Sequence, residues 1–292
     1  MASPWKVVDL IGVTKTFFEK KGIVSSARLD AELLLAKVLG CRRIDLYLRF
    51  DQVVAEPQLS EFRALVKERG ERRRPVKQIL GHCEFMSHDF EVTPDVLIPR
   101  PETEMLVEQV LLGLGQGPQT VVDIGTGSGN IAISIALARP DAAVWATEIS
   151  GPALAVARRN AERHGVAARV TLLHGDLFAP LPGHGLEGQV DCAVSNPPYV
   201  AESEMPALMP DVAEHEPRVA LVSGEDGLGH TLRILAEAPR YLRAGGLLAL
   251  ETSPFTAERA RAAAEANGAY EGVRVVRDLQ RIERILTGRK KA

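Results

Sequence analysis

The chain has 292 residues, of which 46% are hydrophobic and 25% are charged, and its formal net charge is −3. This length is typical of about two domains, and the composition is that of a globular protein, which excludes disordered and fibrous classes. No apolar run approaches the ~18 residues that a membrane helix needs, and the start of the chain lacks the pattern of a secretory signal. We therefore expect a cytoplasmic protein with no membrane partner.

Cysteine, histidine and charge patterns narrow the function further. Cys41, Cys83 and Cys192 lie far apart, and the seven histidines show no catalytic or metal-ligand spacing, so we predict no disulfide and no metal site. The negative charge argues against stable nucleic-acid binding. Residues 1–85 hold 16 Lys and Arg against 11 Asp and Glu, and the remainder holds 19 against 27. This difference predicts either a separate partner-facing surface or merely a solvated helical face.

The first 80 residues are predicted to be helical. The run from Ser25 to Gly40 has a serine to cap its start, Leu and Ala at helical spacing, and a glycine placed to end it in a left-handed conformation. A second helix is predicted to begin at Ser60 and to run towards Arg69. From Glu84 to Ile98 the pattern changes to short extended pieces, which predicts a hairpin linker.

From residue 120 onward, short β-branched runs alternate with amphipathic helical stretches. The runs cover residues 120–124, 144–147, 170–173, 190–194, 247–250 and 273–276. Strands that alternate with helices in this way predict crossover connections and an α/β fold with a mainly parallel, doubly wound sheet. Ligands bind beyond the carboxyl ends of such strands, so we expect the functional residues directly after each run.

The first run ends in a glycine-rich turn, Gly125-Thr126-Gly127-Ser128-Gly129, followed by an apolar helix. The glycines let the backbone approach a ligand closely, and the helix amides point towards it, which predicts a site for a nucleotide-like group. The spacing departs from the dinucleotide pattern G-x-G-x-x-G. It is similar instead to the G-x-G-x-G loop of S-adenosylmethionine-dependent methyltransferases. The alternative is a glycine turn that holds no ligand.

Two carboxylates follow the next strands. Glu148 ends the second run and could accept hydrogen bonds from both hydroxyls of a ribose, although a carboxylate there could also simply begin the next helix. Asp176 follows the third run and could accept from an adenine amino group, with Leu177 and Phe178 as apolar contacts to the ring. A capping role in a loop is the alternative for Asp176.

The fourth run is followed by Asn196-Pro197-Pro198-Tyr199. The two prolines fix an extended backbone and remove two amide donors, which leaves carbonyl oxygens and the Asn196 side chain to face the cleft. The Asn196 oxygen and the Pro197 carbonyl could accept both hydrogens of a planar NH2 group and orient its nitrogen towards a methyl donor. Tyr199 could pack against the flat substrate group. Taken alone, this tetrapeptide would more often be a plain turn.

Taken together, these motifs resemble the peptide-chain release factor glutamine methyltransferase family, and the resemblance covers nearly the whole chain. Its motifs include Arg43 to Tyr47, Val96 to Glu104, Asp123 to Gly129, Ser195 to Tyr199 and Gly224 to Leu228. Within the Val96 to Glu104 segment, Arg100 and Glu102 could line the mouth of the cleft or simply form an acid-rich first helical turn.

The resemblance implies a seven-stranded Rossmann-like methyltransferase sheet in residues 100–292, a helical substrate-recognition domain in residues 1–80 and a hairpin linker in residues 81–99. It implies S-adenosylmethionine as cofactor and methylation of the glutamine of the Gly-Gly-Gln loop in a release factor. Separately, we expect a monomer. Residues 125–129, Glu148, Asp176, Leu177 and Asn196 would contact the cofactor. Asn196, Pro197 and Tyr199 would act in catalysis, and Asn196 to Tyr199 would bind the glutamine.

Some positions depart from the family pattern, namely Gln78, Met86-Ser87, Leu177 and Thr252-Ser253.

Other functions also remain open. A glutamine of a ribosomal protein is an alternative substrate, because the amino-terminal region rather than the active site would select the partner. An adenine or guanine amino group in a nucleic acid is another, because it is also a planar NH2. A non-catalytic module that only binds the cofactor is a third alternative.

Overall fold

The computed structural model describes residues 4–292, which divide into two compact units. The amino-terminal unit contains residues 4–81 and the segment Met209–His215. The sheet unit contains His82–Leu208 and Glu216–Ala292. The chain therefore leaves the sheet unit after residue 208, adds seven residues to the amino-terminal unit and returns, which the sequence does not indicate. Among the described residues no helix is long and apolar enough to cross a membrane.

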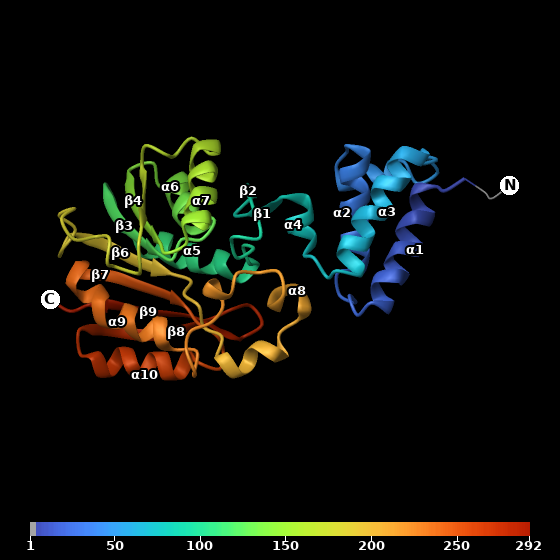
Figure 1. The fold of residues 1–292 in the computed structure, drawn as a ribbon. Helices are drawn as coiled ribbons and strands as arrows, with labels where there is room; N and C mark the ends of the chain where they lie inside the picture. The colour runs from blue at the N-terminus through green and yellow to red at the C-terminus, as the bar shows by residue number, and fades with distance from the viewer. Residues whose placement is uncertain (1–3) are drawn as a thin grey trace. The chain divides into compact units, whose positions relative to one another are not determined.

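The amino-terminal unit is helical (Figure 1). Its helices are α1 (Val7–Lys20), α2 (Ala27–Leu39), α3 (Glu56–Gly70), α4 (Val76–Leu80) and the short α8 (Pro210–Ala213), with a 3-10 helix at Arg43–Leu48. The first three helices contact one another around a buried core that includes Phe18, Leu34, Leu35 and Phe62. Burying such side chains stabilises a unit by about 1.5–3 kcal/mol each.

The predicted helix ends in this unit are partly correct. Gly40 ends α2 with φ 60°, as expected for a left-handed glycine cap. The predicted serine cap is wrong, because Ser26 donates its hydroxyl to Asp30 instead of accepting a backbone hydrogen bond. The predicted start at Ser60 is also wrong, because α3 begins at Glu56. Pro57 sits in the first turn of α3, where its missing amide hydrogen costs nothing.

The predicted hairpin is present as β1 (His82–Phe85) paired antiparallel with β2 (His88–Glu91). No strand continues through the remainder of the predicted stretch, up to residue 98. The turn residues Met86 and Ser87 have φ values of 50° and 62°. A two-residue turn with both φ values positive favours glycine at its second position, so the serine is held in a strained conformation.

Relieving this strain is expected to stabilise the protein. Ser87→Gly should raise the free energy of unfolding by about 0.5–1 kcal/mol, because left-handed strain of ~1–2 kcal/mol outweighs the extra unfolded-state entropy of glycine, ~0.4–1 kcal/mol. Urea unfolding of the variant would measure the change. Ser87→Ala is the matched control, since alanine keeps the strain. A gain of equal size in that control would show that the backbone conformation is not the cause.

The sheet unit is a seven-stranded sheet covered by helices on both faces (Figure 1). Its strands are β3 (Gln119–Ile124), β4 (Ala142–Glu148), β5 (Val170–His174), β6 (Val190–Ser195), β7 (Leu242–Glu251), β8 (Tyr270–Arg277) and β9 (Glu283–Lys290). Its helices are α5 (Pro101–Gly113), α6 (Asn130–Ala138), α7 (Gly151–Arg163), α9 (Gly229–Tyr241) and α10 (Ala257–Asn267). All six predicted runs lie in strands, and β9 is the strand that the runs did not include.

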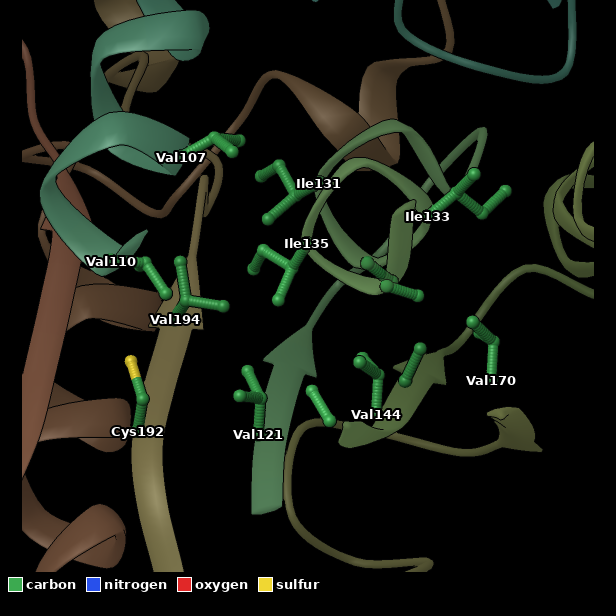
Figure 2. Close-up of a cluster of buried hydrophobic side chains, with 14 of the residues drawn as sticks. Val107, Val110, Val121, Ile131, Ile133, Ile135, Val144, Val170, Cys192 and Val194 are labelled. Carbon is green, nitrogen blue, oxygen red and sulfur yellow. The ribbon is translucent and has the colours of Figure 1, made fainter. Parts of the chain in front are cut away.

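Successive side chains along the strands point to opposite faces of the sheet and pack into two separate hydrophobic cores. Val121 of β3 belongs to one buried cluster with Val107 and Val110 of α5 and with Ile131 and Ile135 of α6, as Figure 2 shows. The neighbouring Val122 faces the other core, which α9 and α10 cover. A period of two residues is what a strand buried on both faces requires.

The strand order is β5-β4-β3-β6-β7-β9-β8. The strands from β5 to β7 are parallel, and β9 is antiparallel to both of its neighbours. The mainly parallel α/β sheet is thus confirmed. The chain starts at β3, moves outward to β4 and β5, and then crosses back to β6 on the other side of β3. This reversal creates the crevice between β3 and β6 in which ligands of such sheets bind.

Candidate functional site

A cavity opens at the carboxyl ends of β3, β4, β5 and β6, where the sequence predicted the functional residues. Its walls include Gly125 to Ser128 after β3, Glu148 at the end of β4, Asp176 and Leu177 after β5, and Asn196 and Pro198 after β6. The predicted residues Gly129, Pro197 and Tyr199 are not among those that line it. The parallel strands therefore bring together residues that are up to 73 positions apart in the sequence, from Gly125 to Pro198.

The three glycines of the turn have different surroundings. All three have positive φ values, 72° at Gly125, 57° at Gly127 and 82° at Gly129. A Cβ added at Gly125 or Gly127 would meet no protein atom within 4 Å, so their backbone borders open space. A Cβ at Gly129 would lie 2.8 Å from Cδ1 of Ile133 and 3.2 Å from Cβ of Ala157. The first two glycines leave room for a ligand, and the third lets two helices pack closely.

Alanine at two of these glycines is expected to separate ligand binding from folding. Gly127→Ala should weaken binding of the cavity's ligand by about tenfold or more, because the new methyl group enters the open space and the backbone is strained by ~1–2 kcal/mol. Gly129→Ala should lower the free energy of unfolding further, because the same strain adds to the clash with Ile133. Calorimetry and urea unfolding of both variants would test this. If both variants changed ligand binding and stability equally, the separate roles of Gly127 in ligand binding and of Gly129 in helix packing would be contradicted.

Glu148 is held in a fixed orientation by the backbone. Its Oε2 accepts a hydrogen bond from the Gly127 amide at 2.8 Å, and its Oε1 accepts one from the Ser150 amide at 2.8 Å. Ser150 caps α7, so the carboxylate does contact a helix start, as the alternative interpretation held. It also lines the cavity, and each of its oxygens can accept a further hydrogen bond. The two interpretations are therefore compatible in this structure.

The segment after β5 differs from the prediction at one residue. Asp176 lines the cavity and forms an ion pair with Arg233 at 2.6 Å. Leu177 also lines the cavity and has φ 46°, a strained value for leucine of the kind that clusters at ligand sites. The predicted role of Phe178 is wrong. Its ring is 1% exposed and stacks on Tyr241, with ring centroids 5.2 Å apart, so it belongs to the core.

The segment Asn196 to Tyr199 follows β6 at the edge of the cavity. Asn196 is half-buried, and its Nδ2 donates to Oγ1 of Thr103 at 3.3 Å. Pro197 is buried beneath the surface, whereas Pro198 lines the cavity. Burial raises the pKa of Tyr199, so its hydroxyl stays protonated at neutral pH. This arrangement offers hydrogen-bond acceptors and a neutral aromatic ring, but no strong base.

A buried carboxyl group forms hydrogen bonds that hold the glycine turn in place. Asp123 is fully buried, and its Oδ2 accepts hydrogen bonds from the Thr126 hydroxyl at 2.6 Å and from the Ala132 amide at 3.2 Å. Burial raises its pKa to about 7, and the nearby Glu148 acts in the same direction. The side chain therefore ties the turn to the first turn of α6.

The cavity also contains residues that the sequence did not single out. His230 of α9 lines it, and its Nδ1 lies 2.8 Å from the Ser223 hydroxyl. Burial lowers the pKa of His230, which favours the neutral ring. Arg100, for which the sequence left two roles open, lines the cavity and pairs with buried Glu216 at 2.6 Å. No sequence pattern marks His230, because it reaches the cavity only through the packing of α9.

Comparison with known proteins gives the family. Residues 9–81 match the model of the PrmC N-terminal domain, and residues 102–217 match that of the methyltransferase small domain. The release factor glutamine methyltransferase of Rhodopirellula baltica is 45% identical over 99% of this chain and 97% of its own length. That of Geobacter sulfurreducens is 44% identical over 87% of this chain and 86% of its own length.

Solved structures agree with these relatives on the fold. A methyltransferase from Pyrococcus furiosus has a TM-score of 0.51 and 21% identity and covers 74% of this chain and 94% of its own. A Thermus thermophilus 16S rRNA methyltransferase in complex with AdoMet and guanosine has a TM-score of 0.50 and 22% identity and covers 72% of this chain and 50% of its own. The sheet unit therefore has a methyltransferase fold. Given its identity to relatives over nearly its full length, the chain belongs to the release factor glutamine methyltransferase family.

Proposed function

We propose that this chain transfers a methyl group from S-adenosylmethionine to the side-chain amide nitrogen of a glutamine, namely the glutamine of the Gly-Gly-Gln loop of a peptide chain release factor. One observation carries the proposal. The Asn196 amide, an acceptor suited to a carboxamide NH2, lines the same cavity as the glycine turn and Glu148. The relatives that match nearly the whole chain bear the name of this activity.

The residues present fit the cofactor. The open space beside Gly125 and Gly127 admits a ligand close to the backbone. Glu148 is aligned by two amides and can accept from the two hydroxyls of a ribose. Asp176 and Leu177 supply an acceptor and an apolar surface for the adenine. Thr126, Ser128 and the start of α6 would complete the site, while Gly129 acts through packing.

The bound cofactor would supply an electrophilic methyl group, so the protein needs no strong general base. In our proposal, Asn196 Oδ1 and the Pro197 carbonyl accept the two N–H groups of the substrate amide and point its nitrogen at the methyl carbon. These acceptors would stabilise the positive charge that develops on nitrogen as the carbon–sulfur bond of the methyl donor breaks, and the nitrogen then loses one of its two protons to solvent. Pro198, which lines the cavity beside Asn196, would hold the flat amide in place, and the rigid proline pair keeps the acceptors from moving.

Methyl transfer to purified release factor tests this proposal. The protein would be incubated with radiolabelled S-adenosylmethionine and, in separate reactions, release factor, its loop variant with Gln→Ala, ribosomal proteins and a nucleic-acid mixture. We expect label in release factor alone and none in the loop variant. Label that persists in the loop variant would show that the loop glutamine is not the methylated residue. Label confined to ribosomal protein or nucleic acid would show that release factor is not the substrate. Two further expectations remain predictions: the chain acts as a monomer, and it does not bind nucleic acid stably.

A further inference from the structure

A histidine of α9 lies in the part of the cavity that Asp176 and Leu177 form. His230 lines the cavity together with these two residues. An ion pair holds α9 against the segment after β5, because Arg233 Nη2 donates to Asp176 Oδ2 at 2.6 Å. Residues three positions apart share one face of a helix, so His230 faces the same segment as Arg233. Leu228, directly before α9, belongs to the same hydrophobic cluster as Leu177.

A buried serine fixes the imidazole ring of His230. The hydroxyl oxygen of Ser223 accepts a hydrogen bond from the His230 backbone amide at 2.8 Å. The same oxygen lies 2.8 Å from Nδ1 of the ring. Ser223 is 0% exposed, and within residues 4–292 its hydroxyl hydrogen has no acceptor other than Nδ1. One ring nitrogen is therefore bound to the protein, and the other, Nε2, is left for a ligand in the cavity.

These hydrogen bonds determine which ring nitrogen carries the hydrogen. The serine hydroxyl has a single hydrogen, and Nδ1 can accept it only when Nδ1 is unprotonated. In a neutral ring the hydrogen then lies on Nε2. The opposite tautomer would leave the buried hydroxyl hydrogen without an acceptor, which is unfavourable. Burial also lowers the pKa of His230, so the ring is neutral at neutral pH. His230 thus presents one N–H donor to the cavity.

An acceptor and a donor therefore stand on the same side of the cavity. Asp176 can only accept, and its carboxylate keeps free lone pairs while it is paired with Arg233. His230 can only donate through Nε2. On the edge of an adenine ring the amino group is a donor, and the ring nitrogens nearest to it, N1 and N7, are acceptors. An acceptor next to a donor in the protein matches the amino group and one of these two nitrogens.

We propose that His230 binds the adenine ring of the cofactor, with its Nε2–H donating to the ring nitrogen next to the amino group, while Asp176 accepts from the amino group. This inference rests on the proposed function, because it concerns the cofactor of the same methyl transfer. Ser223 is a positioning residue, because it acts only through the tautomer and orientation of the His230 ring.

Binding of S-adenosylhomocysteine, measured by calorimetry, tests the contact without turnover. His230→Phe keeps a flat ring but has no donor, and we expect it to raise the Kd by about 3- to 10-fold, the effect of losing one hydrogen bond. His230→Gln keeps an NH2 donor and should retain most of the affinity. His184→Phe is the matched control, because His184 is exposed and is not among the residues that line the cavity. It should keep the native Kd.

Two analogues of S-adenosylhomocysteine identify the acceptor. The 1-deaza and 7-deaza forms each replace one ring nitrogen by C–H. One of them should bind to the native protein about 3- to 10-fold more weakly than the parent compound. For that analogue, His230→Phe should cause no further loss, because the hydrogen bond is already absent. If His230→Phe raises the Kd by the same factor for the parent compound and for both analogues, the contact with the ring nitrogen is wrong.

NMR of protein labelled with 15N-histidine tests the tautomer in the absence of any ligand. The chain has seven histidines, and the ring signals that are missing in His230→Gln identify His230. At neutral pH we expect Nδ1 to be unprotonated and Nε2 to be protonated in the native protein. Ser223→Ala should give a mixture of the two tautomers. A hydrogen on Nδ1 of the native protein would overturn the inference.

The outcomes separate this inference from the proposed function. If S-adenosylhomocysteine binds normally but release factor is not methylated, the proposed function fails and the contact with adenine stands. If release factor is methylated but His230→Phe keeps the native Kd, this inference is wrong and the proposed function stands. If His230→Phe does not fold, the native protein must still show the Nε2–H tautomer and the weaker binding of one analogue, and failure of either would overturn the inference.

Discussion

Asn196→Ala is expected to lower kcat for methyl transfer to release factor by at least about 10²–10³-fold, while the Kd for S-adenosylmethionine changes little. The loss of one preorganised polar group that acts on a developing charge has an effect of this size. Asn196 lines the cavity together with the glycine turn and Glu148, and in our proposal the turn and Glu148 hold most of the cofactor. The variant should therefore bind the cofactor and fail in the chemical step.

Single-turnover kinetics and calorimetry on the same preparation would separate these two effects. The urea unfolding curve of Asn196→Ala should match that of the native protein, since the residue is half-buried and, among residues 4–292, its side chain forms a hydrogen bond with Thr103 alone. Normal cofactor binding together with native turnover would contradict the proposed mechanism. Loss of cofactor binding with unchanged folding would instead assign Asn196 to the cofactor site.

The sequence predicted the strands that have strong local signals and missed the one that depends on its neighbours. The runs at 120–124 and 190–194 are rich in Val and lie in central strands. In contrast, β9 has charged residues at both ends and a glycine near its end, and only Ile285, Leu286 and Thr287 suggest a strand. It forms because β7 and β8 pair with it on both sides. Such tertiary pairing overrides local propensity.

The candidate site could be predicted wherever its residues follow strands directly. Gly125, Glu148, Asp176 and Asn196 each come within two residues of a strand end, and the parallel order of the strands brings them to one edge. Residues that reach the site from helices could not be found in this way. Thr103, in the first turn of α5, carries no motif of its own for hydrogen bonding to Asn196. Phe178 was misassigned because adjacent residues in a turn can point to opposite sides, one to the cavity and one to the core.

The second large effect is expected at a buried ion pair in the amino-terminal unit. Arg69 is 5% exposed; its Nε donates to Asp30 at 2.6 Å, and its Nη1 donates to Asp211 at 2.6 Å. Arg73 also donates to Asp211, at 2.7 Å. Asp211 belongs to the segment 209–215, which the chain adds to this unit between Pro198 and Pro217, two residues that line the cavity. The two ion pairs of Asp211 thus hold the segment 209–215 within the amino-terminal unit.

Arg69→Met should lower the free energy of unfolding of the amino-terminal unit by about 3–5 kcal/mol, because Asp30 is left as a buried charge without its cation. The chain has two tryptophans, so in a Trp145→Phe background the emission of Trp5 reports on this unit alone during urea unfolding. Arg63→Met is the matched control, since Arg63 forms an exposed pair with Glu56 and should cost at most ~1 kcal/mol. Equal losses in the two variants would show that the buried pair has no special role. Asp211 keeps its ion pair with Arg73 in Arg69→Met, so the expected loss of stability comes mainly from Asp30.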